Sequence, residues 1–145
     1  MPGRASEPFA NFYFGGFGNN YIDRANEKRY REYSSFPGAD LNSIGGRNFV
    51  RSMVEWNLPP LRFSRVGTPA AYLAWVRPAL FVSGLMTNLD RADLRRRAVS
   101  AGGQLDFRFT VMAVLDMTFS VCGGVTMEQG RKAAREAMFS LRVLK

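Results

Sequence analysis

The stretch QLDFRFTVMAVLDMTFSV, residues 104–121, alternates apolar and polar residues with a period of two. Leu105 and Phe107 are among the apolar residues, which occupy the odd positions, and Asp106 and Arg108 are among the polar residues between them. Successive side chains of a β-strand point to opposite faces of the sheet. The pattern therefore predicts strands with one apolar face and one polar face.

This stretch is too long for one straight strand, because 18 residues would extend roughly 60 Å at about 3.3 Å per residue. We therefore predict a hairpin with a turn near Val111–Val114, although no Gly, Pro or Asn is present there. Similar patterns along the chain predict about six strands. They are expected near 9–15, 46–58, 69–86, 101–111, 115–122 and 135–144.

Polar segments separate these strands. Residues 16–44 are rich in Asn, Gly and charged residues, which predicts one long loop, and a loop of this length is usually functional or disordered. The charged run at 88–100 predicts a second, solvated loop, with a short helical turn as the alternative. The apolar segment 68–86 is interrupted by Arg77-Pro78, and it fits either one strand with a bulge or a bent pair of strands.

The composition excludes several kinds of site. The chain has no His, which excludes Ser-His and Cys-His catalytic pairs and metal sites that use His. Its single Cys, Cys122, excludes an internal disulfide. No signal-peptide pattern opens the chain and no apolar run is long enough for a membrane helix, so any export signal is expected on sequence outside this chain. We expect no cofactor, no metal and no enzymatic activity.

The fold class predicted is all-β, an antiparallel meander of about six strands that forms part of a transmembrane β-barrel and carries one long polar loop. Opposite charges on one strand face, such as Arg51 with Glu55, are typical of a water-filled lumen, and the apolar face would then meet lipid. Aromatic residues at 9–14 and at Tyr72, Trp56 and Trp75 would mark the membrane interfaces. A soluble sandwich, with the apolar face under a second sheet, is the alternative.

A family resemblance points the same way. Gly45-Gly46 opens a strand that continues through Ser52, Glu55 and Trp56 to Pro59-Pro60. This arrangement, with the preceding GGFGNN and long loop, resembles the carboxy-terminal part of the bacterial surface-antigen superfamily of outer-membrane barrels, over residues 9–145. Members of that superfamily insert other barrels into the outer membrane or secrete partner proteins. The resemblance implies an outer-membrane location, contact with outer-membrane lipid and lipopolysaccharide, and a barrel-assembly machine as a partner.

The resemblance also implies a role for the long loop. In the superfamily this loop enters the lumen, and an Arg-Gly-Phe element pins it to the barrel wall. This chain has KRYREYSSFPG at 28–38, without that element. We hypothesise that Arg31 or Arg29 takes the arginine's part against Asp106 or Glu55, whereas a solvated loop arginine is the plainer interpretation. The closing strand ends in Val143-Leu144-Lys145 instead of an aromatic residue, which weakens it as an insertion signal.

Even the smallest single-chain barrels need eight strands, so a piece with six leaves two open edges. We therefore expect residues 1–145 to be one unit, either the carboxy-terminal part of a longer protein, which pairs with upstream strands of that protein, or a truncated gene product. Its role would be to close a barrel involved in assembly or secretion and to shape the lumen. The residues predicted to face the lumen or pin the loop are Arg31, Arg47, Arg51, Glu55, Arg77, Asp106, Arg108 and Arg142.

The strongly basic composition supports a second function class. The formal charge is +8, with 17 Arg and 3 Lys, which suits binding to phosphates or reflects a GC-rich genome. A soluble β-domain could bind single-stranded nucleic acid through Arg95–Arg97 and the loop at 24–31, with aromatic residues at 12–14 stacking on bases. In the barrel interpretation no nucleic acid is expected.

Overall fold

The computed structural model describes residues 11–17, 28–64 and 66–144. Residues 9 and 10 of the first predicted strand and residues 24–27 of the predicted phosphate-binding loop lie outside this part of the chain. Within the described ranges, no helix has the length and apolar composition needed to cross a membrane.

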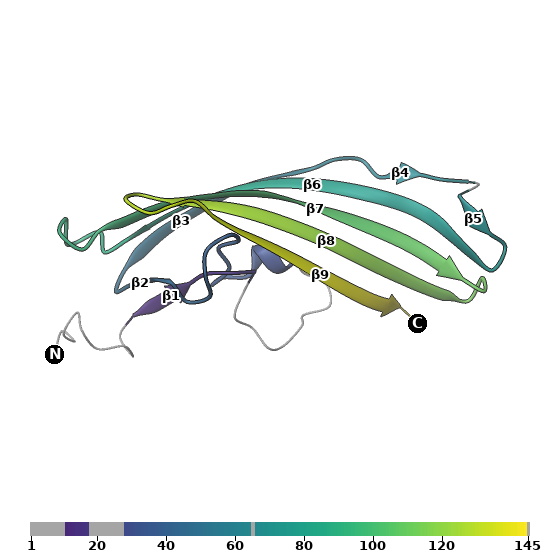
Figure 1. Cartoon of the computed structure of the whole chain (residues 1–145), viewed down its shortest axis with the longest axis horizontal. Helices are drawn as coiled ribbons and strands as arrows, with labels where there is room; N and C mark the ends of the chain where they lie inside the picture. Colours follow the sequence, from purple (N-terminus) through teal and green to yellow (C-terminus); the bar gives the residue numbers. More distant parts are fainter. Residues whose placement is uncertain (1–10, 18–27, 65, 145) are drawn as a thin grey trace.

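One large antiparallel sheet dominates the structure (Figure 1). Its five main strands are neighbours in chain order, and two short strands pair with β6 at the side that β3 leaves uncovered. The main strands are β3 (Phe49–Asn57), β6 (Ala71–Thr87), β7 (Arg96–Val111), β8 (Leu115–Glu128) and β9 (Ala134–Leu144), and the short ones are β4 (Leu61–Arg62) and β5 (Gly67–Thr68). This confirms the all-β antiparallel meander. The sheet is open, with β3 and β9 as the ends of the path.

The amino-terminal strand differs from the prediction. We predicted a strand of the large sheet at 9–15, but β1 (Phe12–Phe14) pairs only with β2 (Ile44–Gly46), in a separate two-stranded sheet. Figure 1 shows this small sheet beneath the curved large one, next to the 3-10 turn η2 (Arg29–Arg31). Phe14 is fully buried, and its ring centroid lies 4.7 Å from that of Phe49. The aromatic run therefore does not continue the large sheet, and its last residue, Phe14, fills a core.

The two faces of the large sheet have the predicted chemistry. Val54, Phe139 and Leu141 are 74%, 65% and 60% exposed on the apolar face. No segment of the described chain covers this face, which we call the outer face. The opposite inner face carries buried polar residues such as Gln104 and Ser120.

Two small hydrophobic clusters lie between the inner face and the segments beneath it. In one, Phe14, Phe36 and Ile44 pack against Leu85 and Ala98 of the sheet. The other cluster joins loop and sheet residues, and its members are Phe17, Tyr30, Phe81 and Cys122, with Met53 and Met138 at its margin. The core of this chain thus holds a loop against a sheet and leaves the outer face uncovered.

The hairpin predicted within 104–121 is confirmed, because β7 ends at Val111 and β8 begins at Leu115. Met112 and Ala113 adopt positive φ angles of 51° and 55°. L-residues with side chains rarely adopt this left-handed conformation, which Gly and Asn tolerate best. The long alternating segments on both sides impose the turn, although its residues do not favour it.

Two strand boundaries were wrong. Residues 96–100, predicted as part of a charged loop, begin β7, and Arg96 forms an ion pair with Glu128 of β8. β8 also continues past Gly123-Gly124, where we ended it, as far as Glu128. A Cβ added to Gly124 would lie 2.7 Å from Cβ of Pro37, so this glycine gives the loop room to approach and does not end the strand.

The segment 71–87 is a single strand, with a register shift between Leu73 and Trp75. Pro78 is accommodated within it, because its carbonyl oxygen accepts a bond from the Leu58 N–H on the β3 side. The N–H and C=O of one strand residue point to the same neighbour. The missing amide hydrogen of Pro78 therefore removes no bond to β7, and it faces the point where β3 has ended.

Candidate functional site

The site is formed where the segment at 28–43, which we call the inner loop, lies on the inner face. The turn η2 presents Tyr30 to the sheet. The Tyr30 side chain is fully buried, and its ring stacks on that of Phe81 of β6, with 4.4 Å between centroids. Burial of two aromatic rings in one stacked pair supplies both apolar contact and a fixed orientation. The phenol hydroxyl is thereby directed to a defined position on the inner face of the sheet.

Glu55 of β3 is the acceptor at that position. Tyr30 Oη donates to Glu55 Oε1 at 2.8 Å. The Arg31 guanidinium forms a two-pronged contact, from Nε to Oε2 at 2.7 Å and from Nη2 to Oε1 at 2.8 Å. Lys28 Nζ lies 3.4 Å from the same carboxylate and donates to Asn57 Oδ1 at 2.7 Å. The carboxylate of Glu55 thus binds three side chains of the loop, and two-pronged Arg contacts fix geometry as well as charge.

These contacts alter the acidity of the loop groups. Burial, and then the hydrogen bond to Glu55, raises the pKa of the Tyr30 phenol well above its usual range. The hydrogen bond to Glu55 raises the pKa of the Arg31 guanidinium. Burial lowers the pKa of the Lys28 ammonium, and the attraction of Glu55 only partly opposes this change. Burial thus disfavours the charged form of Lys28.

Arg51, four residues before Glu55 on the same face of β3, holds the loop by its backbone. Its Nη1 donates to the carbonyl oxygens of Glu32 and Tyr33, at 2.7 Å each. Its Nη2 donates to the Tyr30 carbonyl at 3.1 Å and to Ser35 Oγ at 3.2 Å. These carbonyls lie within or just after a single 3-10 turn, so Arg51 satisfies acceptors that a longer helix would have used.

The loop makes a second attachment at Pro37-Gly38, to strands β7 and β8 on the same inner face. The Pro37 carbonyl oxygen accepts hydrogen bonds from the hydroxyls of Ser100 on β7 and Thr126 on β8, the second at 2.7 Å. Gly38 adopts a φ of 92°, and a Cβ there would lie 2.6 Å from the Thr126 amide nitrogen. Only glycine fits this close approach without strain. The loop is therefore fixed at two separate places on the sheet.

Comparison with known proteins gives no relative. No protein-family model, curated protein or solved structure matches the chain. The superfamily resemblance thus stays a hypothesis, and the geometry described above carries the functional argument.

The structure brings together three of the residues selected from the sequence. Arg31 binds Glu55, and Arg51 holds the backbone of the same loop. Arg31 does not bind Asp106, the other proposed acceptor, whose hydroxyl donor is Ser120 at 2.7 Å. The second candidate arginine, Arg29, approaches Glu32 at 3.9 Å.

The other selected residues lie apart from this cluster. Arg77 pairs with Asp106 at 3.4 Å, and Arg108 pairs with Asp116 near the β7–β8 turn. Arg47 lies in the link between β2 and β3, where its backbone N–H donates to Asn88 Oδ1. Arg142 of β9 lines a pocket with Lys28 and Gln104.

Sequence reasoning did not single out Tyr30, Pro37 or Gln104, and Lys28 entered only as part of the loop at 24–31 in the nucleic-acid alternative. A tyrosine within a polar segment belongs to no strand pattern, so its burial has no periodic signal. Pro37-Gly38 was interpreted only as loop chemistry, although a Pro-Gly pair is also suited to a close backbone approach. Gln104 was seen as one polar residue of an alternating strand. For these residues only the tertiary arrangement reveals the contact.

The residues of the nucleic-acid alternative are distributed differently from what stacking on bases requires. Phe14 is buried, while Phe12 and Tyr13 are 44% and 39% exposed. Arg96 is engaged by Glu128 and by the Ser43 carbonyl, and Arg95 donates to the Leu89 carbonyl. Within the described ranges, no group of three or more His, Cys, Asp and Glu side chains could hold a metal ion.

Proposed function

We propose that this chain forms part of the wall of a transmembrane β-barrel in the bacterial outer membrane, with the inner loop folded into the lumen. One observation carries the proposal: the only loop that covers the sheet, among the described residues, lies on the polar face, and the apolar face stays uncovered. A soluble sheet buries its apolar face. An apolar band that faces outward, opposite a polar interior, is the pattern of a barrel in lipid.

Strand length supports this proposal. The shortest main strand, β3, has 9 residues, β9 has 11 and β6 has 17. A tilted strand crosses the hydrocarbon region with about 9 to 11 residues. β3 pairs with residues 79–87 of β6, next to the charged turn at 88–95. The extra residues of β6, 71–78, lie at the other end of the sheet and would extend beyond the membrane on that side. Trp56, 65% exposed on the outer face, would lie near one interface.

The barrel would be completed by strands that pair with the two edges of the sheet. β3 and β9 each have one neighbour in the sheet formed by the described residues. Unpaired backbone groups are not tolerated in hydrocarbon, so both edges require partners there. We propose that upstream strands of the same full-length protein provide them. Assembly or secretion, outer-membrane lipid and lipopolysaccharide as contacts, and help from a barrel-assembly machine rest on the superfamily resemblance.

Two neighbouring positions test this orientation. Leu141 of β9 points to the outer face. Thr118 of β8 points to the inner face, because it pairs with Arg142, the residue that follows Leu141 in β9. Spin labels would be attached at Leu141→Cys and at Thr118→Cys, in a Cys122→Ala background of the full-length protein in lipid bilayers. We expect the label at 141 to be relaxed by lipid-dissolved oxygen and the label at 118 by a water-soluble nickel chelate. Preference of both labels for the nickel chelate would exclude the membrane proposal.

A further inference from the structure

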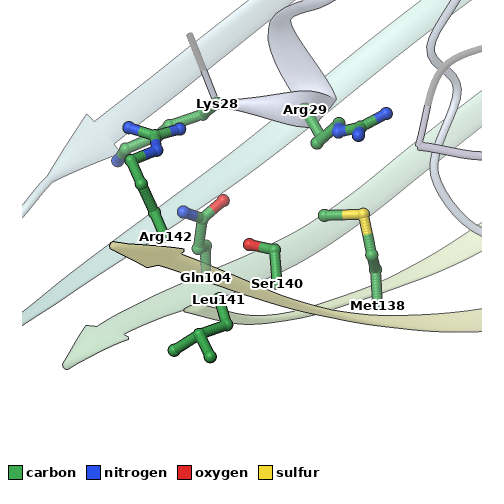
Figure 2. A pocket seen from close by; sticks show the side chains of 7 residues that line it. All are labelled: Lys28, Arg29, Gln104, Met138, Ser140, Leu141 and Arg142. Atoms are coloured by element: carbon green, nitrogen blue, oxygen red, sulfur yellow. The ribbon is translucent and has the colours of Figure 1, made fainter. Parts of the chain in front are cut away.

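A small pocket lies between the inner loop and strands β7 and β9 (Figure 2). It has a volume of about 30 Å³. Lys28 and Arg29 of the loop and Gln104, Ser140 and Arg142 of the sheet line it. Figure 2 shows the side chains of Gln104, Ser140 and Arg142 pointing from the sheet toward the loop, whereas Leu141 points to the opposite face. Room for about two water-sized groups is available, since one such group needs roughly 10–15 Å³.

The pocket has an excess of positive charge. Three of its lining residues are cations, and none is a carboxylate. Lys28 is held by Glu55 and Asn57, and Arg29 approaches Glu32. Arg142 forms no hydrogen bond or ion pair with any residue that the structure describes. A partly enclosed guanidinium without a counter-ion attracts an anion more strongly than an exposed one, because the low dielectric strengthens the interaction.

Gln104 adds a second requirement. It is 7% exposed, and its Nε2 donates to Asp106 Oδ1, which fixes the orientation of the amide. Its Oε1 is buried and has no partner among the described residues. A buried acceptor left unpaired destabilises a protein by about 1–3 kcal/mol. The occupant that suits the pocket therefore carries a hydrogen-bond donor next to its negative charge.

We propose that the pocket binds a phosphate group that keeps one P–OH, as in hydrogen phosphate or a singly protonated phosphate ester. Arg142, assisted by Lys28, Arg29 and the Ser140 hydroxyl, would neutralise the phosphoryl oxygens. The P–OH would donate to Gln104 Oε1. Two oxygens fit within the pocket, and the remainder of the group projects through its opening. This inference does not depend on the membrane proposal, because every residue used lies on the inner face.

Inorganic phosphate and sulfate provide the test, since they share size and shape but only phosphate has a hydroxyl near neutral pH. Their affinities would be measured by titration calorimetry with the full-length protein in detergent micelles. We expect phosphate to bind at least tenfold more tightly than sulfate. Arg142→Gln should weaken both anions at least tenfold, and Gln104→Leu should abolish the preference for phosphate. Ser140→Ala, which disturbs packing less than the other two replacements, should lower the affinity for phosphate severalfold.

Arg135→Gln is the matched control, because it removes the same charge from an exposed position of β9. It should change phosphate affinity less than twofold. Equal affinities for phosphate and sulfate in the unmodified protein would overturn the proposal, as would an equal loss in Arg135→Gln and Arg142→Gln. An absence of binding would show that water alone fills the pocket, which also refutes it.

A competition experiment distinguishes two sources of phosphate. Because the pocket opens on the face away from the apolar side chains, a soluble ester should reach it and a lipid headgroup should not. At about pH 5.5, where a phosphate monoester keeps one P–OH, glycerol 3-phosphate is expected to compete with inorganic phosphate, and phosphatidic acid in the same micelles is not. Competition by phosphatidic acid alone would contradict the assignment to a soluble ester.

Discussion

Replacement of Glu55 by Gln should release the inner loop locally, without unfolding the sheet. Glu55 accepts two hydrogen bonds from Arg31 and one from the buried Tyr30 hydroxyl. Its contact with Lys28 is longer, at 3.4 Å, and Lys28 keeps its closer partner Asn57 at 2.7 Å when Glu55 is replaced. A hydrogen bond to a charged group contributes about 1.5–3 kcal/mol, and a neutral one about 1 kcal/mol. The amide oxygen of Gln can still accept from Tyr30, and its NH₂ group would face Arg31.

The expected cost follows from these changes. The bond from Tyr30 becomes neutral and loses about 1 kcal/mol. The Arg31 side chain is 40% exposed, so its contribution is discounted to about 1 kcal/mol. The docked state of the loop would lose about 2 kcal/mol in total, which corresponds to an increase of about 30-fold in the undocked population. Arg51 and the Pro37 attachment would keep the loop near the wall.

Amide hydrogen exchange measures this change directly. The amides of Arg31, Ser35 and Phe36 donate to backbone carbonyls within or beside the loop, and their exchange reports its opening. In the full-length protein in detergent, Glu55→Gln should accelerate these amides about 30-fold. Asp116→Asn is the control, because this carboxylate binds Arg108 and Thr110 in the β7–β8 hairpin and does not contact the loop. Unchanged loop exchange in Glu55→Gln, or equal acceleration in Asp116→Asn, would refute the reasoning.

Three further predictions concern the loop and the outer face. The raised pKa of Tyr30 keeps its phenol protonated in the docked loop, whereas a free tyrosine ionises near pH 10. The docked state therefore keeps its full stability below about pH 10. Above that pH its free energy of docking falls by about 1.4 kcal/mol per pH unit. Phenolate absorbance at pH 11 should therefore be the same for Tyr30→Phe and the unmodified protein, and a loss in the variant would contradict the buried position. Gly124→Val should accelerate amide exchange at the Pro37 attachment by more than tenfold, because a Cβ at position 124 clashes with Pro37. Gly123→Val is the control and should not, because the atom nearest to a Cβ at position 123 is 3.9 Å away. Equal effects of the two variants would exclude the close approach. Val54→Arg should reduce the folding free energy in lipid vesicles by about 2–4 kcal/mol, measured by urea titration, and a change below 0.5 kcal/mol would argue against lipid at that position.

The large sheet could be predicted because its information is local. Polar and apolar residues alternate along β3, β7 and β9, so the polarity of each residue indicates which face of the sheet it occupies. The turn at Met112–Ala113 was also predictable, from the length of the strands on either side and not from its own residues. Strand ends were harder to place, since Arg96 belongs to a charged run and Gly124 to a glycine pair. Their positions in strands are explained only by Glu128 and Pro37 across the fold.

The loop site was predictable only in outline. A resemblance to a superfamily suggested two arginines and two carboxylates, and the structure joins Arg31 with Glu55, 24 positions later in the chain. Such a distance leaves no pattern in the sequence, because nothing local fixes the path of the loop between them. The aromatic run at 12–14 misled the prediction for a related reason, since the same residues suit a wall strand and a buried core equally.

The hydrogen bonds from Arg51 to the loop affect how the sequence of this protein can evolve. Most acceptors of the Arg51 hydrogen bonds are peptide carbonyls, which every amino acid supplies. These bonds therefore do not depend on which side chains the loop carries at those positions. Mutations in those loop side chains can accumulate without releasing the segment, provided that its length and path are kept. A short insertion or deletion there would shift the carbonyls out of reach and be far more harmful than any single replacement.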